Sequence, residues 1–578
     1  MNEQANFPDP GLFRAPGIGR RDLLQGAAAL LGTALVSPRG SAAQAASAMP
    51  KAQDSVPASR PAVIASDETA IAETSTGRVR GYLREGIFTF KGIPYGDTTA
   101  GSGRFAPPRA PQPWTGIRSS MHYGPVCPQA PRGTWGDDEE SFLFEYEDGY
   151  SGEDCLRLNI WTPALQGAGK RPVMVWLHGG GFVSGSCQEH RAYEGERLSR
   201  RGDVVVVSLN HRLGPLGFLN LTQFGEPYAA SANLGMLDIV AALEWVRDNI
   251  GNLGGDPSNV TIFGQSGGGG KVGALMTMPA AQGLFHRAIV QSGSFLRALI
   301  PERSEILTRA VFDELNLSPS QVDKLQSIPL HTLIAAGDAA LLKTHPPTPL
   351  AWNRVADILG WGPVVDGRYL PHHPFDSAAP AISAQVPMLI GTVMNEFTTS
   401  LNHPALEAMT EAEASRRLED MYGVDPRRIL EVFRASYPGA NTFDLFSLAM
   451  TAQVRQAAVI QAGLKAAQGT PSYLYWFQWK TPVLDGRPRS IHCIDLPFCF
   501  DNTDRSENLT GGGPVPRALA ARVSEAWIQF ARTGNPNHDG LPHWPAFSAS
   551  NCTTMIFDNE CTLENDPDHA ERQIIQRA

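Results

Sequence analysis

One serine of the chain stands in a setting that would make it a nucleophile. Ser266 lies in the run GQSGG (264–268), directly after an apolar stretch that ends at Phe263. A Gly-x-Ser-x-Gly turn between a strand and a helix projects the serine oxygen above the sheet. The flanking glycines leave room for the neighbouring strand and helix. The pattern predicts a serine that attacks a carbonyl carbon.

The same glycines could instead cradle a phosphate, because four of them precede Lys271. A phosphate-binding loop needs a glycine five residues before its last glycine and Ser or Thr after the lysine. This chain has Gln265 and Val272 at those positions. The sequence therefore favours the nucleophile.

A second glycine run could stabilise the oxyanion that such a serine generates. The sequence HGGGF (178–182) follows an apolar stretch that ends at Leu177. Consecutive glycines let backbone N–H groups converge on one point, and losing one such donor costs about 2.7–4 kcal/mol of transition-state stabilisation. We predict that Gly180 and Gly181, with the N–H of Gly267, form the oxyanion hole.

The base and the acid should follow the serine in the order Ser, acid, His. Glu396 lies just beyond the apolar run 386–391 and could orient an imidazole; Asp366 is a rival whose setting is more typical of a turn. Ten histidines follow Ser266. His492 precedes an apolar Leu-Pro-Phe segment, and residue patterns alone leave the choice open against three rivals: His372, His373 and His543.

Short apolar runs alternate with amphipathic stretches along the chain. Runs such as 172–177 and 204–209 are nearly all apolar or β-branched, which is typical of strands covered on both faces. The pattern predicts further strands at 260–263, 286–291, 386–391 and 473–479, and helices at 233–250, from the serine turn to 278, and at 516–532. This alternation indicates a mostly parallel sheet with helices on both faces and the active site at the carboxyl ends of its strands.

Composition excludes several classes of protein. The net charge of −10 and the lack of a basic stripe argue against nucleic-acid binding. Hydrophobic residues make up 42% of the 578, without a run long enough for a stable membrane span. No metal-ligand cluster is visible, and the predicted chemistry needs no cofactor.

The N-terminal region resembles an export signal. Arg20-Arg21 precedes an Ala-rich apolar stretch to Val36 and then Ala43-Gln44-Ala45, so residues 1–45 are interpreted as a twin-arginine-type signal peptide rather than a short membrane anchor. Residues 46–66 are predicted to be a disordered linker, and 67–578 the catalytic domain. The protein is thus expected in the periplasm or outside the cell, where some of its seven cysteines should pair. Cys127 with Cys155, and Cys552 with Cys561, are the candidate pairs.

Several longer motifs resemble the type-B carboxylesterase family, which includes cholinesterases and bacterial para-nitrobenzyl esterases and has the α/β-hydrolase fold. The similarity runs from about Thr74 to Phe557. Its motifs are FKGIPYG (90–96), RF with two prolines (104–108), EDCLRLNI (153–160), NHRLGPLGF (210–218), GGDP (254–257) and FARTGNP (530–536). The resemblance implies Ser266, Glu396 and His492 as the triad, and a disulfide between Cys127 and Cys155.

Three departures from the family pattern surround the nucleophile. Gln265 replaces the usual Glu, which removes a negative charge and should disfavour cationic substrates such as choline esters. Gly267 replaces the usual Ala and is expected to loosen the turn. Gly269, Gly270 and Lys271 replace a run of small residues, and the sequence offers no physical account of the lysine.

The expected reaction is two-step acyl transfer from a small ester, first to Ser266 and then to water. The alternative from another class is a non-catalytic cholinesterase-like binding protein with the same fold. Within the enzyme class, a lipase, an amidase or a detoxifying esterase are the alternatives. Phe182, Gln265 and Phe397 adjoin the catalytic positions and are candidate pocket residues, although either phenylalanine could equally belong to the core. Acyl and alcohol preferences and the oligomeric state are not predicted.

Overall fold

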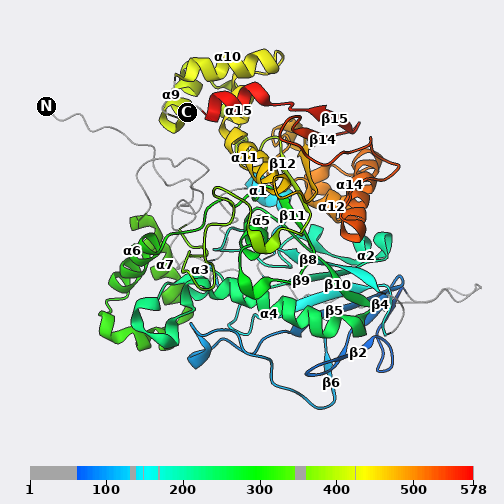
Figure 1. Ribbon diagram of the computed structural model, residues 1–578, viewed down its shortest axis with the longest axis vertical. Helices are drawn as coiled ribbons and strands as arrows, with labels where there is room; N and C mark the ends of the chain where they lie inside the picture. The colour runs from blue at the N-terminus through cyan, green and yellow to red at the C-terminus, as the bar shows by residue number, and fades with distance from the viewer. Residues whose placement is uncertain are drawn as a thin grey trace, which may run out of the picture.

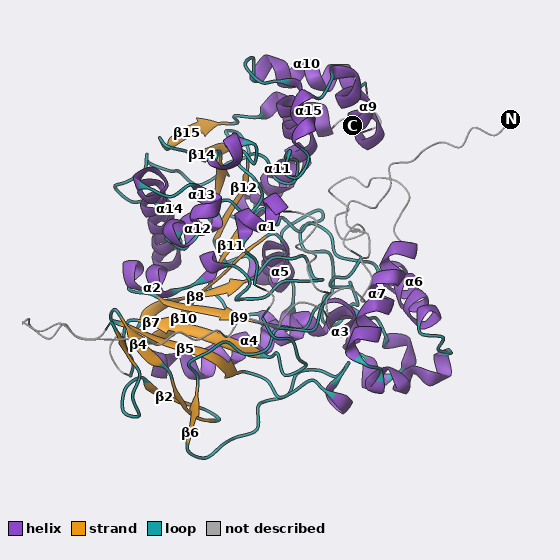
Figure 2. Cartoon of the chain, turned by 180° about the vertical axis from the view of Figure 1, so that it is seen from behind, coloured by secondary structure: helices purple, strands orange, loops and turns teal. Residues whose placement is uncertain are grey.

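A computed structural model describes residues 62–130, 138–147, 149–166, 170–344, 360–422 and 425–576. A large twelve-stranded sheet runs through the centre of this part of the chain (Figures 1 and 2). In spatial order its strands are β1 (Val63–Ile64), β4 (Tyr82–Arg84), β5 (Ile87–Pro94), β7 (Arg157–Thr162), β9 (Val205–Leu209), β8 (Arg171–Leu177), β10 (Gly255–Gln265), β11 (Arg287–Gln291), β12 (Met388–Val393), β13 (Ser472–Phe477), β14 (Thr553–Phe557) and β15 (Thr562–Asn565). A separate small sheet contains β2 (Ile71–Thr74), β3 (Gly77–Arg80) and β6 (Ile117–Ser119).

The seven strands from β9 to β14 pair in parallel, whereas the strands at the two ends of the sheet pair antiparallel. All six strands predicted from apolar runs are present, as β8 to β13. The mostly parallel sheet of an α/β-hydrolase is therefore confirmed. In a parallel sheet the carboxyl ends of the strands meet at one edge, and the catalytic motifs follow those ends.

Helices cover both faces of the sheet because the strand side chains are buried on both. On β8, Val173, Val175 and Leu177 belong to a core shared with α4 (Leu234–Asn249), α5 (Gly267–Leu275) and α11 (Thr442–Ala466). Met174 and Trp176, which alternate with them, belong to a second core shared with α2 (Glu196–Gly202) and α14 (Pro514–Thr533). This alternation explains why the strand reads as continuously apolar.

The other helices pack around these two layers. The helices α9, α10 and α15 gather at one end of the molecule and share a third core with α11, while α6 and α7 lie together at its flank (Figure 1). The bounds of the remaining helices are α1 (Asp138–Phe144), α3 (Gly214–Phe218), α6 (Pro301–Glu314), α7 (Leu330–Thr344), α9 (Glu411–Tyr422), α10 (Pro426–Ser436), α12 (Leu496–Cys499), α13 (Glu507–Thr510) and α15 (His569–Gln576).

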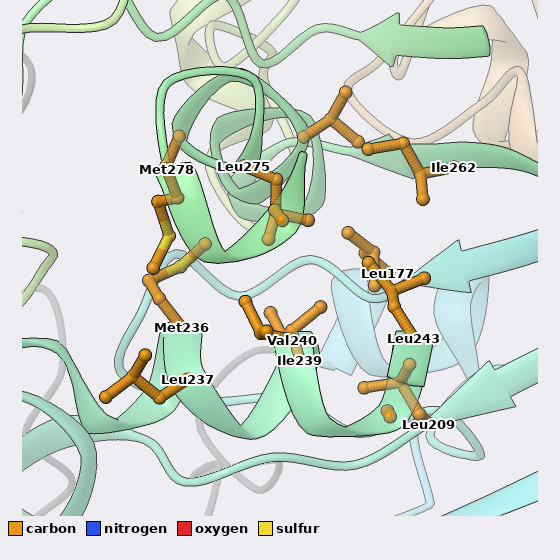
Figure 3. Packing of buried hydrophobic residues seen from close by; sticks show 14 of the residues in the cluster. Leu177, Leu209, Met236, Leu237, Ile239, Val240, Leu243, Ile262, Leu275 and Met278 are labelled. Carbon is orange, nitrogen blue, oxygen red and sulfur yellow. The ribbon is translucent and has the colours of Figure 1, made fainter. Parts of the chain in front are cut away.

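The helix that follows Ser266 rests on a dense apolar contact with α4. Side chains of α4 and α5 meet between the two helices, with Leu177 from β8 and Ile262 from β10 beside them (Figure 3). A buried ion pair adds to this support, because Arg212, in the segment after β9, binds Asp238 of α4 with its Nη2 2.6 Å from Oδ1. These contacts fix the helix on which the predicted oxyanion donor Gly267 lies.

The predicted signal peptide, 1–45, lies outside the described residues, as does the linker up to residue 61. The last linker residues are ordered, since Val63 and Ile64 form β1 and pair with β4. The predicted linker therefore extends too far. Within the described residues one segment, Glu226–Leu253, is long and apolar enough to cross a membrane, and 78% of its apolar window is buried inside the fold, as a core helix is.

The cysteine predictions meet two different outcomes. Cys127 and Cys155 are both buried and their side chains lie within hydrogen-bonding reach, but they are free thiols, so the implied disulfide is not formed in this structure. The Cys127 sulfur accepts the N–H of Leu213 at 3.2 Å. The suggestion that Cys552 pairs with Cys561 is wrong. Cys552 directly precedes β14, and Cys561 lies near the other end of this strand, where the antiparallel β15 begins. The five residues of β14 span ~16 Å at ~3.3 Å per residue, far beyond the ~7 Å limit for disulfide Cα atoms.

Candidate active site

Ser266 occupies the tight turn that the sequence predicts. It follows β10 and precedes α5, and its backbone has φ 56° and ψ −125°, a conformation that non-glycine residues rarely adopt. The N–H of Ser266 donates to Gln291 O of the neighbouring β11 at 2.8 Å. Glycine is required beside it, because a Cβ on Gly264 would lie 2.5 Å from the Gly268 carbonyl carbon. Elements on both sides thus hold the strained serine in place.

Glu396 and His492, 96 residues apart in sequence, are joined by two hydrogen bonds. His492 Nδ1 lies 2.6 Å from Glu396 Oε2, and the backbone N–H of His492 donates to Glu396 O at 2.8 Å. The carboxylate is itself fixed, because its Oε1 accepts the N–H of Val393 at 3.1 Å and its side chain is 1% exposed. A buried carboxylate at Nδ1 selects the tautomer whose Nε2 is free to accept a proton.

The side chain of Gln265 lies against the imidazole. Gln265 Nε2 is 3.1 Å from His492 Nε2 and 3.4 Å from Nδ1. A donor aligned with the Nε2 lone pair would lie much farther from Nδ1 than from Nε2, so the amide contacts the face of the ring. The Nε2 lone pair is therefore left for another donor. No hydrogen bond joins Ser266 Oγ to the imidazole within the described part of the chain, and such bonds are often long in a site without substrate.

Cys493 is a member of this cluster that the sequence analysis did not identify. Its thiol donates to Gln265 Oε1 at 3.3 Å, and its backbone has φ 75°. Burial alone would lower the pKa of His492, but Cys493 and Glu396 more than offset it and raise that pKa above its ordinary value. The position next to His492 was the signal that could have drawn attention to this cysteine.

A second buried acid, Asp495, follows His492 by three residues in the chain. Asp495 Oδ2 accepts hydrogen bonds from Gln291 Nε2 at 3.0 Å and from Tyr475 Oη at 3.1 Å. Burial raises the pKa of Asp495 to about 6, and the negative charge of Glu396 contributes to the rise. Asp495 thus ties the segment that carries His492 to β11 and β13.

The predicted oxyanion donors lie beside the serine. Gly180 and Gly181 have φ 78° and 61°, values that favour glycine. A Cβ on Gly179 would lie 3.5 Å from Ser266 Cβ, and one on Gly267 would lie 2.5 Å from the nitrogen of Gly181. The glycine run and the start of α5 are thus in direct contact around Ser266. A methyl group at position 267 would not fit here, since the Gly181 backbone occupies its space.

Lys271 points into this contact. Its side chain is completely buried, and Nζ donates to His178 O at 2.8 Å and to Gly179 O at 3.5 Å. Burial lowers the pKa of Lys271 to about 7, although the charge of Glu189 opposes the shift. The residue without an explanation in the sequence therefore binds the base of the oxyanion loop.

The two candidate pocket phenylalanines differ in their surroundings. Phe182 is 1% exposed and packs against Phe218 and Phe295 in the core, so its ring is a core residue. Phe397 is 52% exposed, and its ring centroid lies 4.1 Å from that of His492. Phe397 is therefore placed to contact a molecule bound at the imidazole.

The rival catalytic residues have structural surroundings. Asp366 Oδ1 accepts the N–H groups of residues 368–370, as in a turn. His373 Nδ1 contacts the backbone N–H of Ala298, and its neighbour His372 contacts the carbonyl of His373. No hydrogen bond or ion pair connects His543 to the Ser266 site in the described ranges. In the same ranges no group of three or more His, Cys, Asp or Glu could hold a metal ion.

Comparison with known proteins gives a consistent result. The model of the carboxylesterase family matches residues 68–574. The para-nitrobenzyl esterase of Bacillus subtilis is 34% identical over 87% of this chain and 98% of its own, and human cocaine esterase is 34% identical over 82% and 86%. Among solved structures, carboxylesterase EST55 of Geobacillus stearothermophilus has a TM-score of 0.73 and 36% identity, covering 88% of this chain and 100% of its own. A Clostridium hathewayi esterase that can hydrolyse aliphatic aromatic polyesters has a TM-score of 0.74 and 36% identity, covering 89% and 99%. This chain belongs to the carboxylesterase family and is a serine hydrolase of carboxylic esters.

Proposed function

We propose that Ser266 is the nucleophile of this esterase, His492 its general base and Glu396 the acid that orients the base. The observation that carries the assignment is the 2.6 Å contact between His492 Nδ1 and a buried Glu396, directly beside the strained Ser266 turn. In this arrangement His492 Nε2 takes the proton of Ser266 Oγ as the oxygen attacks the ester carbonyl. The alcohol leaves with that proton, and water then repeats the sequence to free the acid.

The backbone N–H groups of Gly180, Gly181 and Gly267 are proposed to bind the oxyanion of both tetrahedral intermediates. Their support is the close approach of Gly267 to Gly181, and of Gly179, which precedes Gly180, to Ser266. Gly267 also begins α5, so the positive end of that helix dipole adds to the field at the oxyanion. Because these donors are fixed before the reaction, they need not reorganise as charge develops.

Small esters with an uncharged alcohol are the proposed substrates. The residue against the face of the imidazole is the neutral Gln265, so the site holds no carboxylate there to attract a cationic alcohol. The partially exposed Phe397 offers an apolar surface next to His492. The B. subtilis relative, named a para-nitrobenzyl esterase, is consistent with a neutral aromatic ester.

Covalent labelling tests the triad without a choice of natural substrate. A fluorophosphonate should react with Ser266 in the native enzyme, located by mass spectrometry of the tryptic peptide. His492→Ala should slow labelling by more than about a hundredfold, because a general base contributes 10²–10⁴-fold. Heat-denatured enzyme is the control. Equal labelling rates in the native enzyme and the His492 variant would contradict the assignment.

The catalytic domain is proposed to follow a cleaved export signal, which would deliver it to an oxidising compartment. Arg20-Arg21 and the small residues before Ala46 support this proposal, as does the family match from residue 68 onward. The mature N-terminus should then begin close to Ala46, and replacing both arginines by lysine should retain the precursor inside the cell. An exported fraction that still carries residues 1–45 would contradict it.

In that compartment Cys127 and Cys155 are proposed to form a disulfide. Their support is that two buried thiols already lie within hydrogen-bonding reach of each other. Non-reducing peptide mapping of exported protein should find the two peptides linked, and cytoplasmic expression should yield both cysteines alkylated after denaturation. If both cysteines can still be alkylated in exported protein, the two thiols only pack against each other and the proposed disulfide is refuted.

A further inference from the structure

A lysine is buried in α5, the helix that begins directly after the nucleophile Ser266. The sequence of α5 is GGGGKVGAL, and Lys271 is its only polar side chain, with no exposed surface. Burying an amino group costs free energy unless it is hydrogen-bonded. Lys271 Nζ makes its bonds to the carbonyls of His178 and Gly179, at 2.8 and 3.5 Å. The lysine therefore connects the nucleophile helix with the first two residues of the glycine run.

The second of these carbonyls belongs to the peptide group whose N–H is assigned to the oxyanion hole. The C=O of Gly179 and the N–H of Gly180 are parts of one planar peptide unit. A hydrogen bond accepted by the carbonyl polarises that unit, which makes its N–H a stronger donor. Because the unit is planar, fixing its oxygen also fixes the direction of the N–H. Lys271 therefore binds the carbonyl side of this peptide group, opposite the N–H of Gly180 that we assign to the oxyanion hole.

Other groups hold the same carbonyls. His178 Nδ1 lies 3.0 Å from Gly179 O. A Cβ on Gly185 would lie 2.8 Å from Gly179 O and 3.2 Å from Glu189 Oε1, which places this buried carboxylate close by. The next carbonyl, Gly180 O, accepts the N–H of Ser184 at 3.0 Å and so orients the N–H of Gly181. Both peptide groups of the run that supply an N–H to the oxyanion hole therefore have a hydrogen-bonded carbonyl oxygen.

The glycines of α5 allow the loop to come close enough for the lysine to reach it. A Cβ on Gly268 would lie 2.0 Å from Leu177 O, and one on Gly267 would lie 2.2 Å from Gly181 O. The backbone of residues 177–181 therefore lies directly on the first turn of α5. Lys271, one turn further along, binds the carbonyls of the loop and keeps it on this surface.

We propose that Lys271 is a positioning residue that holds the 178–181 loop on helix α5, so that the N–H groups of Gly180 and Gly181 are aimed at the oxyanion. The inference rests on the proposed function, because it deepens the role assigned to those two donors. It accounts for a lysine that is completely buried in the otherwise apolar helix α5. Lys271 touches neither the serine nor the imidazole in any described contact, so it acts through the loop.

The test replaces Lys271 by methionine, which has a similar length but no donor, and measures hydrolysis of p-nitrophenyl butyrate. Both tetrahedral intermediates place charge in the hole, whereas the bound ester does not. We therefore expect kcat to fall about ten- to a hundredfold, in line with the cost of misplacing a catalytic group by ~1 Å, with KM changed less than about twofold. Inhibition by an aryl trifluoromethyl ketone, whose serine adduct carries an oxyanion, should weaken by the same factor.

Lys465 provides a matched control. It is also a buried lysine that donates to two loop carbonyls, Ser383 O at 2.6 Å and Ala384 O at 3.3 Å, at the opposite, amino edge of the sheet. Lys465→Met should keep kcat and the inhibitor affinity. Equal losses in both variants, or an unchanged kcat in Lys271→Met, would overturn the proposal.

Two further measurements separate the possible failures. If Lys271→Met does not fold, Lys271→Gln is used, whose amide ends one atom short of the carbonyls; an unchanged kcat in that variant would also overturn the proposal. Ser266→Ala is assayed alongside. If the wild type and Ser266→Ala turn over equally, the proposed function itself has failed. If activity requires Ser266 but not Lys271, only the positioning role is refuted.

Discussion

Restoring the carboxylate at position 265 should change both the pH dependence and the selectivity of the enzyme. In Gln265→Glu a carboxylate would replace an amide nitrogen that lies 3.1 and 3.4 Å from the two ring nitrogens of His492. Two unit charges about 4 Å apart interact by about 4 kcal/mol at an effective dielectric constant of ~20. At about 1.4 kcal/mol per pKa unit, the ceiling is a rise of about 3 units in the pKa of His492.

The observed rise should be smaller than this ceiling. Position 265 is 1% exposed, so burying the new carboxylate raises its own pKa and reduces its charge. We expect a net rise of about 1 unit or more in the pKa of His492. Only the neutral imidazole is a base, so the acid limb of kcat/KM should move to higher pH by the same amount. Below that limb the variant should lose about tenfold in kcat/KM per unit.

The assay follows kcat/KM for a neutral p-nitrophenyl ester from pH 5 to 10 in the wild type, Gln265→Glu and the uncharged control Gln265→Met. The ratio of kcat/KM for acetylthiocholine to that for its neutral tert-butyl analogue should rise in the Glu variant alone. A folded Glu variant with an unmoved acid limb and an unchanged ratio would refute the electrostatic reasoning.

Three other perturbations have defined outcomes. Cys493→Ala should move the acid limb to lower pH, because Cys493 helps to raise the pKa of His492; a shift to higher pH in the same titration would contradict this. Asp238→Ala should lower the free energy of unfolding by about 3–5 kcal/mol, since it leaves the buried Arg212 without its counter-charge, and a loss below ~1 kcal/mol in denaturant unfolding would argue against that cost. Burial lowers the pKa of Lys271 from 10.5 to about 7, so the unfolded chain binds more protons between these values and the wild type gains stability as pH rises through them. Lys271→Met lacks this term, so the Tm of the wild type should rise relative to that of the variant between pH 7 and pH 10; a difference that stays constant over this range would show that the pKa of Lys271 is not lowered in the folded protein.

Local patterns predicted the parts of the fold whose side chains face apolar surroundings on every side. The central strands could be predicted because both faces are buried, as the alternating partners of Val175 and Trp176 show. The 25-residue helix α11 was not predicted, because residues such as Phe443 and Ala458 are buried on different sides and leave no single apolar stripe. The antiparallel strands β5 and β7 mix polar and apolar residues and were missed for a similar reason.

The candidate site shows the same division between local and distant information. The Ser266 turn and the glycine run are contiguous in sequence, so the patterns alone identified them. The choice of His492 over other histidines came from the resemblance to a family, because its contact with Glu396 joins residues 96 positions apart. Lys271 and Cys493 gained a role only through distances to backbone and side chains that no local pattern contains.

The central claim is that Ser266 carries the acyl group, and one measurement tests it most directly. Purified wild type and Ser266→Ala, with the same circular dichroism and Tm, are given p-nitrophenyl acetate, and release of nitrophenolate is followed from the first turnover. The account predicts steady hydrolysis by the wild type and a rate for Ser266→Ala that falls to the background level. Equal hydrolysis by the two proteins would place the reaction elsewhere and contradict the account.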